Sequence, residues 1–378
     1  MSNLIYEVLK LNVENSTPLL IGGYDTQAYS EFHEEELRTQ SIKGLWRWWF
    51  RAILSGRHLL QGYTDIETKV KDEVGMVLGF AGRRGSQSSR LALRFTRDKP
   101  PIYRQIKPKQ SGIPPRVSLL TLGGNILNYI ESIRGSLSVY LFSFQEERRT
   151  VKDENVRIAI LSLVSGLLLS GIGKGSRRGL GCIDFKIVED RVGLPESLKR
   201  WIFPDALRDI LNEALPVKKQ VEIKNYPPIP SVAPDFFKLW YIPFEGKEVG
   251  RVLTDLQEFT LRTKRRMVIP ENGEDPFRLK LIAWILGLPR QVKGTGYISG
   301  EIQRRASPLI FSVHRDFATA CLFKSSDWPD NIEWRGRDRK LNIINIKEKL
   351  DSAYKSLESM FLGYMRKKGY NVQEVRIW

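Results

Sequence analysis

The chain has 378 residues, enough for two domains of ordinary size, and its hydrophobic content of 42% excludes a disordered protein. Lys and Arg number 60 against 43 Asp and Glu, which leaves a formal net charge of +17 at pH 7. An excess of this size predicts a polyanionic partner such as nucleic acid, or a basic surface that fits an acidic neighbouring subunit.

Two cysteines, Cys182 and Cys321, are far apart in the sequence, and neither forms a CxxC pair. This spacing argues against zinc and disulfide frameworks and favours a reducing cytoplasm. The N-terminal residues lack the charged and apolar regions of a signal peptide, and no apolar run has the length of a membrane span. We therefore expect a cytoplasmic protein without a membrane partner.

Hydrophobic periodicity in the first half predicts four strands separated by helices and one insertion. The expected strands cover residues 4–13, 90–96, 135–144 and 182–188. The expected helices cover 41–54, capped by Ser41, then 64–78 and 154–170, and a Pro- and Lys-rich insertion covers 100–115. The order strand, helix, strand, strand, helix, strand is that of ferredoxin-like folds and RNA-recognition modules.

A weaker copy of this order follows residue 200. Helices are expected over 201–215, 248–263, 275–287 and 345–368, and strands over 236–244, 309–313, 318–323 and 370–377. The sequence thus predicts an α+β protein with two tandem ferredoxin-like folds and insertions. We expect an N-terminal domain over residues 1–195 and a C-terminal domain over 196–378.

A glycine-rich loop over residues 171–181 holds five glycines and three cations, directly after the apolar helix expected over 154–170. Glycine permits positive φ and a close approach of backbone, and successive N–H groups in such a loop form an anion-binding concavity. A cationic loop of this kind is suited to a phosphate chain. The residues expected to bind RNA phosphate here are Gly173, Lys174, Gly175, Arg177 and Arg178.

The helix expected over 41–54 has an apolar face and a cationic edge, on which Lys43, Arg47 and Arg51 recur every four residues. Gly44 in the first turn costs about 1 kcal/mol relative to Ala, which is reasonable if another backbone comes close there. The open N–H groups of a first helical turn also favour an anion. We expect these four residues to bind RNA, with a merely solvated edge as the alternative. Trp48, off the apolar face, is expected to stack a base or to contact a partner.

Further basic runs occur elsewhere in the chain. Arg83 and Arg84 form a compact cationic turn, and Lys293 with Arg304 and Arg305 makes a second combination of glycine and cations. We expect all five cations to contact phosphate and Tyr297 to stack a base. The second combination is expected to face the same cleft between the two sheets as the glycine-rich loop.

Three stretches resemble the RAMP superfamily of CRISPR proteins, namely residues 17–23, residues 38–52 with Ser-Ile-Lys-Gly and Arg-Trp-Trp, and the glycine-rich loop. The similarity is greatest to the family of subunit one in the Cmr, or type III-B, effector complex, and it continues thinly through residues 304–311. The resemblance implies two ferredoxin-like folds and assembly with other RAMP subunits. It also implies contacts with target RNA and with the 3′ region of the guide RNA, and cleavage by another subunit, so that this chain has no catalytic residue.

The residues themselves do not indicate a catalytic centre. His33, His58 and His314 lie far apart and none has metal-ligand spacing, so we expect neither a metal nor another cofactor. The alternative function is a metal-independent endoribonuclease that processes guide RNA, with His33 as general base. A third possibility is an assembly subunit whose basic surface meets an acidic protein and touches RNA little.

Overall fold

The computed structural model describes residues 4–21, 37–82, 85–107, 113–120, 126–143, 153–215, 223–292, 295–302, 304–336 and 341–378. The predictions for His33, for Arg83 and Arg84, and for Lys293 concern residues outside these ranges. Among the described residues, no helix is both long and apolar enough to cross a bilayer. Both cysteines are free and buried.

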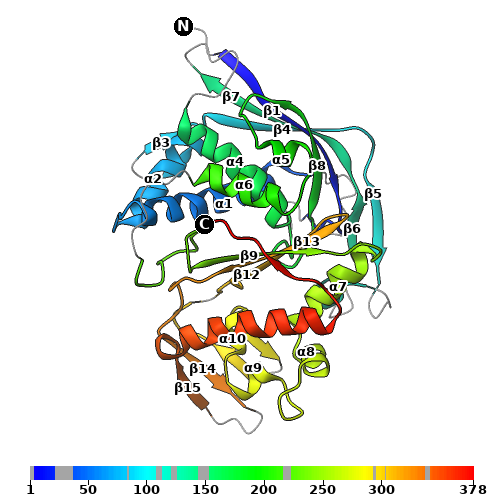
Figure 1. Ribbon diagram of the computed structural model, residues 1–378, viewed down its shortest axis with the longest axis vertical. Coiled ribbons are helices and arrows are strands. Elements are labelled where there is room, and N and C mark those ends of the chain that lie inside the picture. The colour runs from blue at the N-terminus through cyan, green and yellow to red at the C-terminus, as the bar shows by residue number, and fades with distance from the viewer. Residues whose placement is uncertain are drawn as a thin grey trace.

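The first ferredoxin-like fold consists of β1 (Leu4–Asn15), α1 (Thr39–Leu60), β4 (Leu91–Arg97), β7 (Arg134–Ser143), α4 (Glu154–Leu169) and β8 (Ile183–Asp190). Its antiparallel sheet has the order β4-β7-β1-β8. Helices α1 and α4 cover one face of this sheet (Figure 1). The strand and helix order is the one that the sequence predicts.

The second fold repeats this arrangement with β9 (Phe237–Pro243), α7 (Val249–Phe259), β12 (Leu309–Val313), β13 (Phe317–Phe323), α10 (Ile346–Lys367) and β16 (Gln373–Glu374). Its sheet order, β12-β13-β9-β16, places the equivalent strands in the same positions as in the first sheet. Two tandem ferredoxin-like folds are thus confirmed. The domain limits at residues 195 and 196 stay a prediction.

Insertions decorate both folds. The first carries α2 (Ile66–Leu78), β2 (Phe80–Gly82), β3 (Gly85–Gln87), β5 (Ile102–Ile106), α3 (Pro115–Leu120) and β6 (Leu127–Ser132), and is followed by α5 (Glu196–Lys199) and α6 (Asp205–Ala214). The second carries α8 (Arg262–Val268), α9 (Pro276–Leu279), the 3₁₀ helix η1 (Ala283–Leu286), β10 (Arg290–Val292), β11 (Thr295–Ile298), β14 (Asn331–Arg335) and β15 (Leu341–Asn345). The last four strands form a third sheet, β10-β11-β14-β15.

Several sequence expectations are wrong in detail. Helix α1 begins at Thr39 with Arg38 at the N-cap, so Ser41 lies in the first turn and does not cap it. The insertion over 100–115 contains the strand β5, which pairs with β6. Residues 275–287 form two short helical turns instead of one helix, because Lys280 and Leu281 separate α9 from η1.

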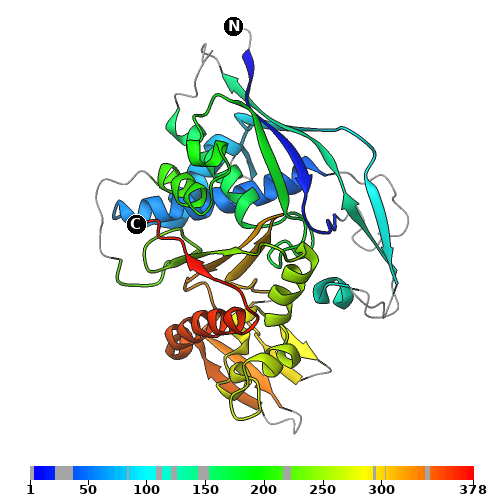
Figure 2. The ribbon, with the colours of Figure 1, turned by 45° about the vertical axis from the view of Figure 1, so that its right-hand side comes forward.

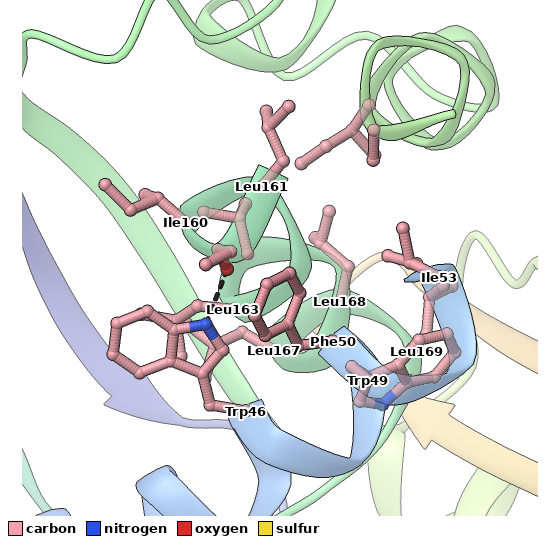
Figure 3. Close-up of a cluster of buried hydrophobic side chains, with 14 of the residues drawn as sticks. Trp46, Trp49, Phe50, Ile53, Ile160, Leu161, Leu163, Leu167, Leu168 and Leu169 are labelled. Atoms are coloured by element: carbon pink, nitrogen blue, oxygen red, sulfur yellow. Dashed lines mark hydrogen bonds between the residues drawn. The ribbon is translucent and has the colours of Figure 1, made fainter. Parts of the chain in front are cut away.

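The main core joins α1 to α4. Trp46, Trp49, Phe50 and Ile53 of α1 are fully buried and interleave with the leucines and isoleucines of α4 (Figure 3). The helices approach closely because residue 166 is glycine, where a Cβ would lie 2.9 Å from the Trp49 ring. Each buried side chain of this size contributes about 1.5–3 kcal/mol, so this face fixes the position of α1.

The second sheet is buried on both faces. In β13, Phe317, Cys321 and Phe323 face the core of α1 and α4, whereas Ala320 and Leu322 face the core of α7 and α10. Figure 1 shows this sheet between the two helical layers. Figure 2 shows the β5–β6 hairpin extending from the first sheet toward α7, where α3 packs.

Candidate nucleic-acid interface

The N-terminal half of α1 exposes the cationic edge that the sequence predicts. Arg51 is exposed, Lys43 is half-buried, and no ion pair in the described part of the chain involves either of them. Among the described residues nothing lies within 4 Å of a Cβ built on Gly44, so no protein backbone accounts for this glycine. The expected close approach of another chain segment is therefore not found there. The surface over this turn is open.

Arg47 lies on the same edge but is already in use. Its guanidinium donates to the carbonyl oxygens of Leu78 and Gly79, with the second distance 2.8 Å, and so caps the C-terminus of α2. Burial, with the nearby charge of Arg51, lowers the pKa of Arg47. A cation at a helix C-terminus is stabilised by the helix dipole, so this arginine holds α2 against α1.

Trp48 and Arg177 form the opposite flank of the edge. The Trp48 ring packs edge-on against Trp49 and Phe323, and the Arg177 guanidinium lies 4.5 Å from its centroid. Arg177 also donates to the carbonyl oxygen of Ser307 at 3.1 Å, and burial lowers its pKa to about 10. Through these contacts, Trp48 joins the glycine-rich loop to α1 and to the second sheet.

The glycine-rich loop packs on itself and on residues 18–21. Four of its glycines have φ between +67° and +82°, as expected. A Cβ at Gly171 would lie 1.9 Å from the Leu180 carbonyl oxygen, and one at Gly173 would lie 2.3 Å from that of Leu20. Six of its amides donate to protein carbonyls, namely those of Gly171, Ile172, Lys174, Arg178, Leu180 and Gly181.

Most of the backbone amides of the loop therefore bind carbonyl oxygens of the protein itself. This differs from the sequence prediction, in which these amides form an anion-binding concavity. Only its turn around Gly173 and Gly175 is exposed, with Lys174 half-buried between them, and burial lowers the pKa of Lys174. The loop also joins the two folds, because the Phe311 amide of β12 donates to the Arg177 carbonyl oxygen at 3.2 Å.

Arg178 is buried instead of facing a channel. The residue is 9% exposed, and one terminal guanidinium nitrogen donates to the Leu286 carbonyl oxygen at 2.9 Å while the other terminal nitrogen has no partner among the described residues. Burial, with the like charges of Arg116, Arg290 and Arg177, lowers the pKa of Arg178 well below its ordinary value. An RNA strand bound along the exposed edge of α1 therefore does not reach the Arg178 guanidinium in this structure.

The second cationic run divides in the same way. Arg304 is exposed, whereas Arg305 is buried, pairs with Asp327 at 2.7 Å and stacks on Trp328 at 4.5 Å. Tyr297 is 5% exposed, so the expectation that its ring stacks a base is wrong for this conformation. Two arginines that the sequence analysis did not single out, Arg116 and Arg290, lie beside Arg178. No local motif marks them, since each stands alone in its stretch of sequence.

Both histidines that the structure describes, His58 and His314, are buried inside the protein. His314 is 1% exposed, with Nδ1 2.6 Å from the Asp184 carboxylate and Nε2 2.8 Å from the Leu168 carbonyl oxygen. His58 is buried beside Glu73 at 3.2 Å. Among the described residues, no group of three or more His, Cys, Asp or Glu could hold a metal ion.

Known proteins resemble this chain in sequence. Residues 12–184 match the family model of the RAMP superfamily. Over 291 residues, the chain is 29% identical to the CRISPR system Cmr subunit Cmr1-1 of Pyrococcus furiosus, and the match covers 74% of this chain and 76% of that protein.

Solved structures share the fold. The crystal structure of apo Cmr1 from Pyrococcus furiosus has a TM-score of 0.54 at 20% identity and covers 99% of both chains. A chain of a type III-B Cmr-beta complex, solved by cryo-EM with cognate target RNA and AMPPnP, has a TM-score of 0.60 at 15% identity, with 95% of this chain and 100% of that one covered. Residues 12–184 thus resemble the RAMP superfamily, and the chain shares its fold with these two structures.

Proposed function

We propose that this chain is an RNA-binding subunit of a type III-B CRISPR ribonucleoprotein effector. In this proposal it assembles with other RAMP subunits and contacts target RNA and the 3′ region of the guide RNA. Its similarity to a Cmr subunit, and its shared fold with a chain of a complex bound to target RNA, support the assignment. Phosphate contacts position a strand without reading its sequence, which suits a subunit whose specificity comes from guide pairing.

The observation that carries the proposal is the open, cationic N-terminal half of α1. At 100° per residue, Gly44 and Arg51 point in nearly the same direction, with Arg47 and Trp48 on either side. Farther along the same face of α1 the surface is closed, because Ser55 and His58 are buried. A ribose-phosphate strand therefore has access to the first turns of α1 and to the exposed turn at Gly173 and Gly175.

The decisive variant is K43A/R51A, because neither side chain takes part in an ion pair among the described residues and Arg51 is exposed. Each phosphate contact to a single strand contributes about 0.7 to the slope of log affinity against log salt. Loss of two contacts should weaken binding of a guide-length RNA at low salt and reduce that slope by about 1.4. Filter binding or fluorescence anisotropy at several salt concentrations measures both quantities.

The matched control is K347A/K355A, which removes two exposed cations of α10 on the other side of the molecule. This control should keep the wild-type slope. An equal loss of RNA affinity in both double variants would mean that only the net charge of the protein matters. An unchanged salt slope in K43A/R51A would contradict the proposed RNA-binding surface on α1.

We further propose that the chain binds RNA without cutting it. The two described histidines support this, because His58 and His314 are both buried and cannot contact an RNA strand bound along α1. Incubation of the pure protein with labelled repeat RNA in EDTA should leave the RNA intact. A cut that disappears in H33A would instead establish the metal-independent nuclease.

A further inference from the structure

Three arginines from distant parts of the chain converge at the C-terminal end of α7. Arg116 of α3 donates to the Thr260 hydroxyl at 2.9 Å, and Arg290 of β10 donates to the Thr260 carbonyl oxygen at 2.7 Å. Arg178 of the glycine-rich loop packs against the same end of α7, because its carbonyl oxygen accepts from Gln257 at 3.0 Å, and its guanidinium donates to the Leu286 carbonyl oxygen at 2.9 Å. We call Arg116, Arg178 and Arg290 the arginine cluster.

No carboxylate among the described residues neutralises the arginine cluster. Asp275, whose charge acts on Arg290, is committed to Arg265, which holds both of its oxygens at 2.6 Å. None of the three arginines takes part in an ion pair in the described part of the chain. The C-terminus of α7 offers only about half a negative charge, against three guanidinium charges. Buried charges in proteins are ordinarily paired, so this excess of positive charge is unusual.

The cluster also has donors without acceptors. The second terminal nitrogen of Arg178 and the Nε of Arg116 are buried and have no hydrogen-bond partner among the residues that the structure describes. A buried donor without an acceptor destabilises the folded state, and more so when it is charged. Burial, with the like charges of Arg265 and Arg116, lowers the pKa of Arg290 to about 10. Arginine keeps its charge in proteins, so the cluster carries an excess of positive charge. The structure thus tolerates a cost that an anion would remove.

We propose that the arginine cluster binds one phosphate group, held between the two ferredoxin-like folds. Three guanidinium groups, two of which have an unused donor within the described structure, match a tetrahedral dianion that has several acceptor oxygens better than they match a carboxylate. Arg116 and Arg290 are half-buried and reach the surface, whereas Arg178 forms the buried base of the site. The phosphate comes either from a free anion or nucleotide, or from one position in an RNA strand. The inference holds even if α1 binds no RNA.

Isothermal titration calorimetry on the full chain tests this site with inorganic phosphate, with chloride used to keep the ionic strength constant. Wild type should bind one phosphate, and R116M/R290M should bind it at least tenfold more weakly. The matched control is R266M, which removes an exposed cation of α8 and should bind as wild type. Absence of saturable binding to wild type, or equal binding by R116M/R290M, would overturn the proposal.

A second pair of variants covers the case in which R116M/R290M does not fold. R116K/R290K keeps both charges but loses the planar forks, so it should stay folded by circular dichroism and still bind phosphate several-fold more weakly. Phosphate affinity equal to that of wild type in this variant would contradict a built site.

Two further titrations distinguish the source of the phosphate. Competition by adenosine 5′-monophosphate indicates a free or terminal phosphate, whereas competition only by an unphosphorylated RNA oligonucleotide indicates a backbone phosphate. Either result supports the site. The K43A/R51A variant should keep its phosphate binding, which separates a failure of this inference from a failure of the proposed RNA surface.

Discussion

Asp153 at the N-terminus of α4 accepts three hydrogen bonds. One oxygen accepts from the amides of Asn155 and Val156 at 3.0 and 3.2 Å, and the other accepts from Arg90 at 2.6 Å. Burial raises the pKa of this carboxyl, but the hydrogen bonds from Arg90 and the two amides outweigh it, so the pKa lies below its ordinary value. The carboxylate also complements the positive end of the helix dipole.

We expect D153A to lose about 1 kcal/mol of unfolding free energy at pH 7, the usual cost of removing an N-cap. Because the pKa is lowered on folding, the stabilisation is complete above about pH 4, the unfolded value, and is lost as the pH falls through the folded value. Urea unfolding of wild type and D153A between pH 7 and pH 3 measures the difference. A difference that stays constant down to pH 3 would contradict this account.

Residue type and spacing predict that cations gather on α1, but not which of them are free. Arg47 and Arg51 occupy equivalent positions one turn apart, yet only Arg47 meets the C-terminus of α2. Likewise Arg304 is exposed and Arg305 is paired with Asp327. The outcome depends on which tertiary neighbour offers an acceptor, and this information is not in the local sequence. The RNA-binding assignments themselves remain predictions.

At the scale of elements, periodicity predicts most helices and strands of both folds. It fails where tertiary contacts set the ends, as at the N-terminus of α1, and where short turns replace a helix over 275–287. The glycine-rich loop shows the same division. Its positive φ values follow from sequence, whereas the use of most of its amides within the protein follows from the packing of residues 18–21 against it.

Gly181 tests the structural part of this loop. A Cβ there would lie 2.1 Å from the Ile172 carbonyl oxygen, so G181A must displace backbone, at a typical cost of 1–3 kcal/mol. Gly193 has a similar positive φ, +77°, but nothing lies within 4 Å of its Cβ position. Both G181A and G193A carry the conformational penalty, and only G181A adds the clash. Guanidinium unfolding should therefore show G181A as the less stable, and equal stabilities would contradict the packing of the loop.

At the scale of the whole molecule, the second sheet contributes to two cores at once. Leu239 faces the helices of the first fold, and the adjacent Trp240 faces α10. The repeated strand order is visible in the sequence, because each fold supplies its own pattern. The stacking of one fold on the other is not visible in the sequence, since a strand buried on both faces shows only a continuous apolar run.

His314 provides a test of this coupling between the folds. It lies between β12 and β13 but contacts Asp184 of β8 and Leu168 of α4, and both ring nitrogens face acceptors. The Ser312 hydroxyl also lies 3.0 Å from Nε2, so removal of the ring leaves several polar groups at this contact without a partner, at about 1–3 kcal/mol for each buried one. The neighbouring Arg315 is 60% exposed in its pairs with Glu14 and Asp184, so R315A should cost less than about 1 kcal/mol.

We therefore expect the wild-type chain to unfold in one calorimetric transition. H314A should move that transition to a lower temperature by several degrees, without splitting it, while R315A leaves it almost unchanged. The reason is that both folds lose their shared core when either one opens. Two separate transitions in the wild type, or a shift in H314A no larger than that in R315A, would show that the folds are stable independently of this contact.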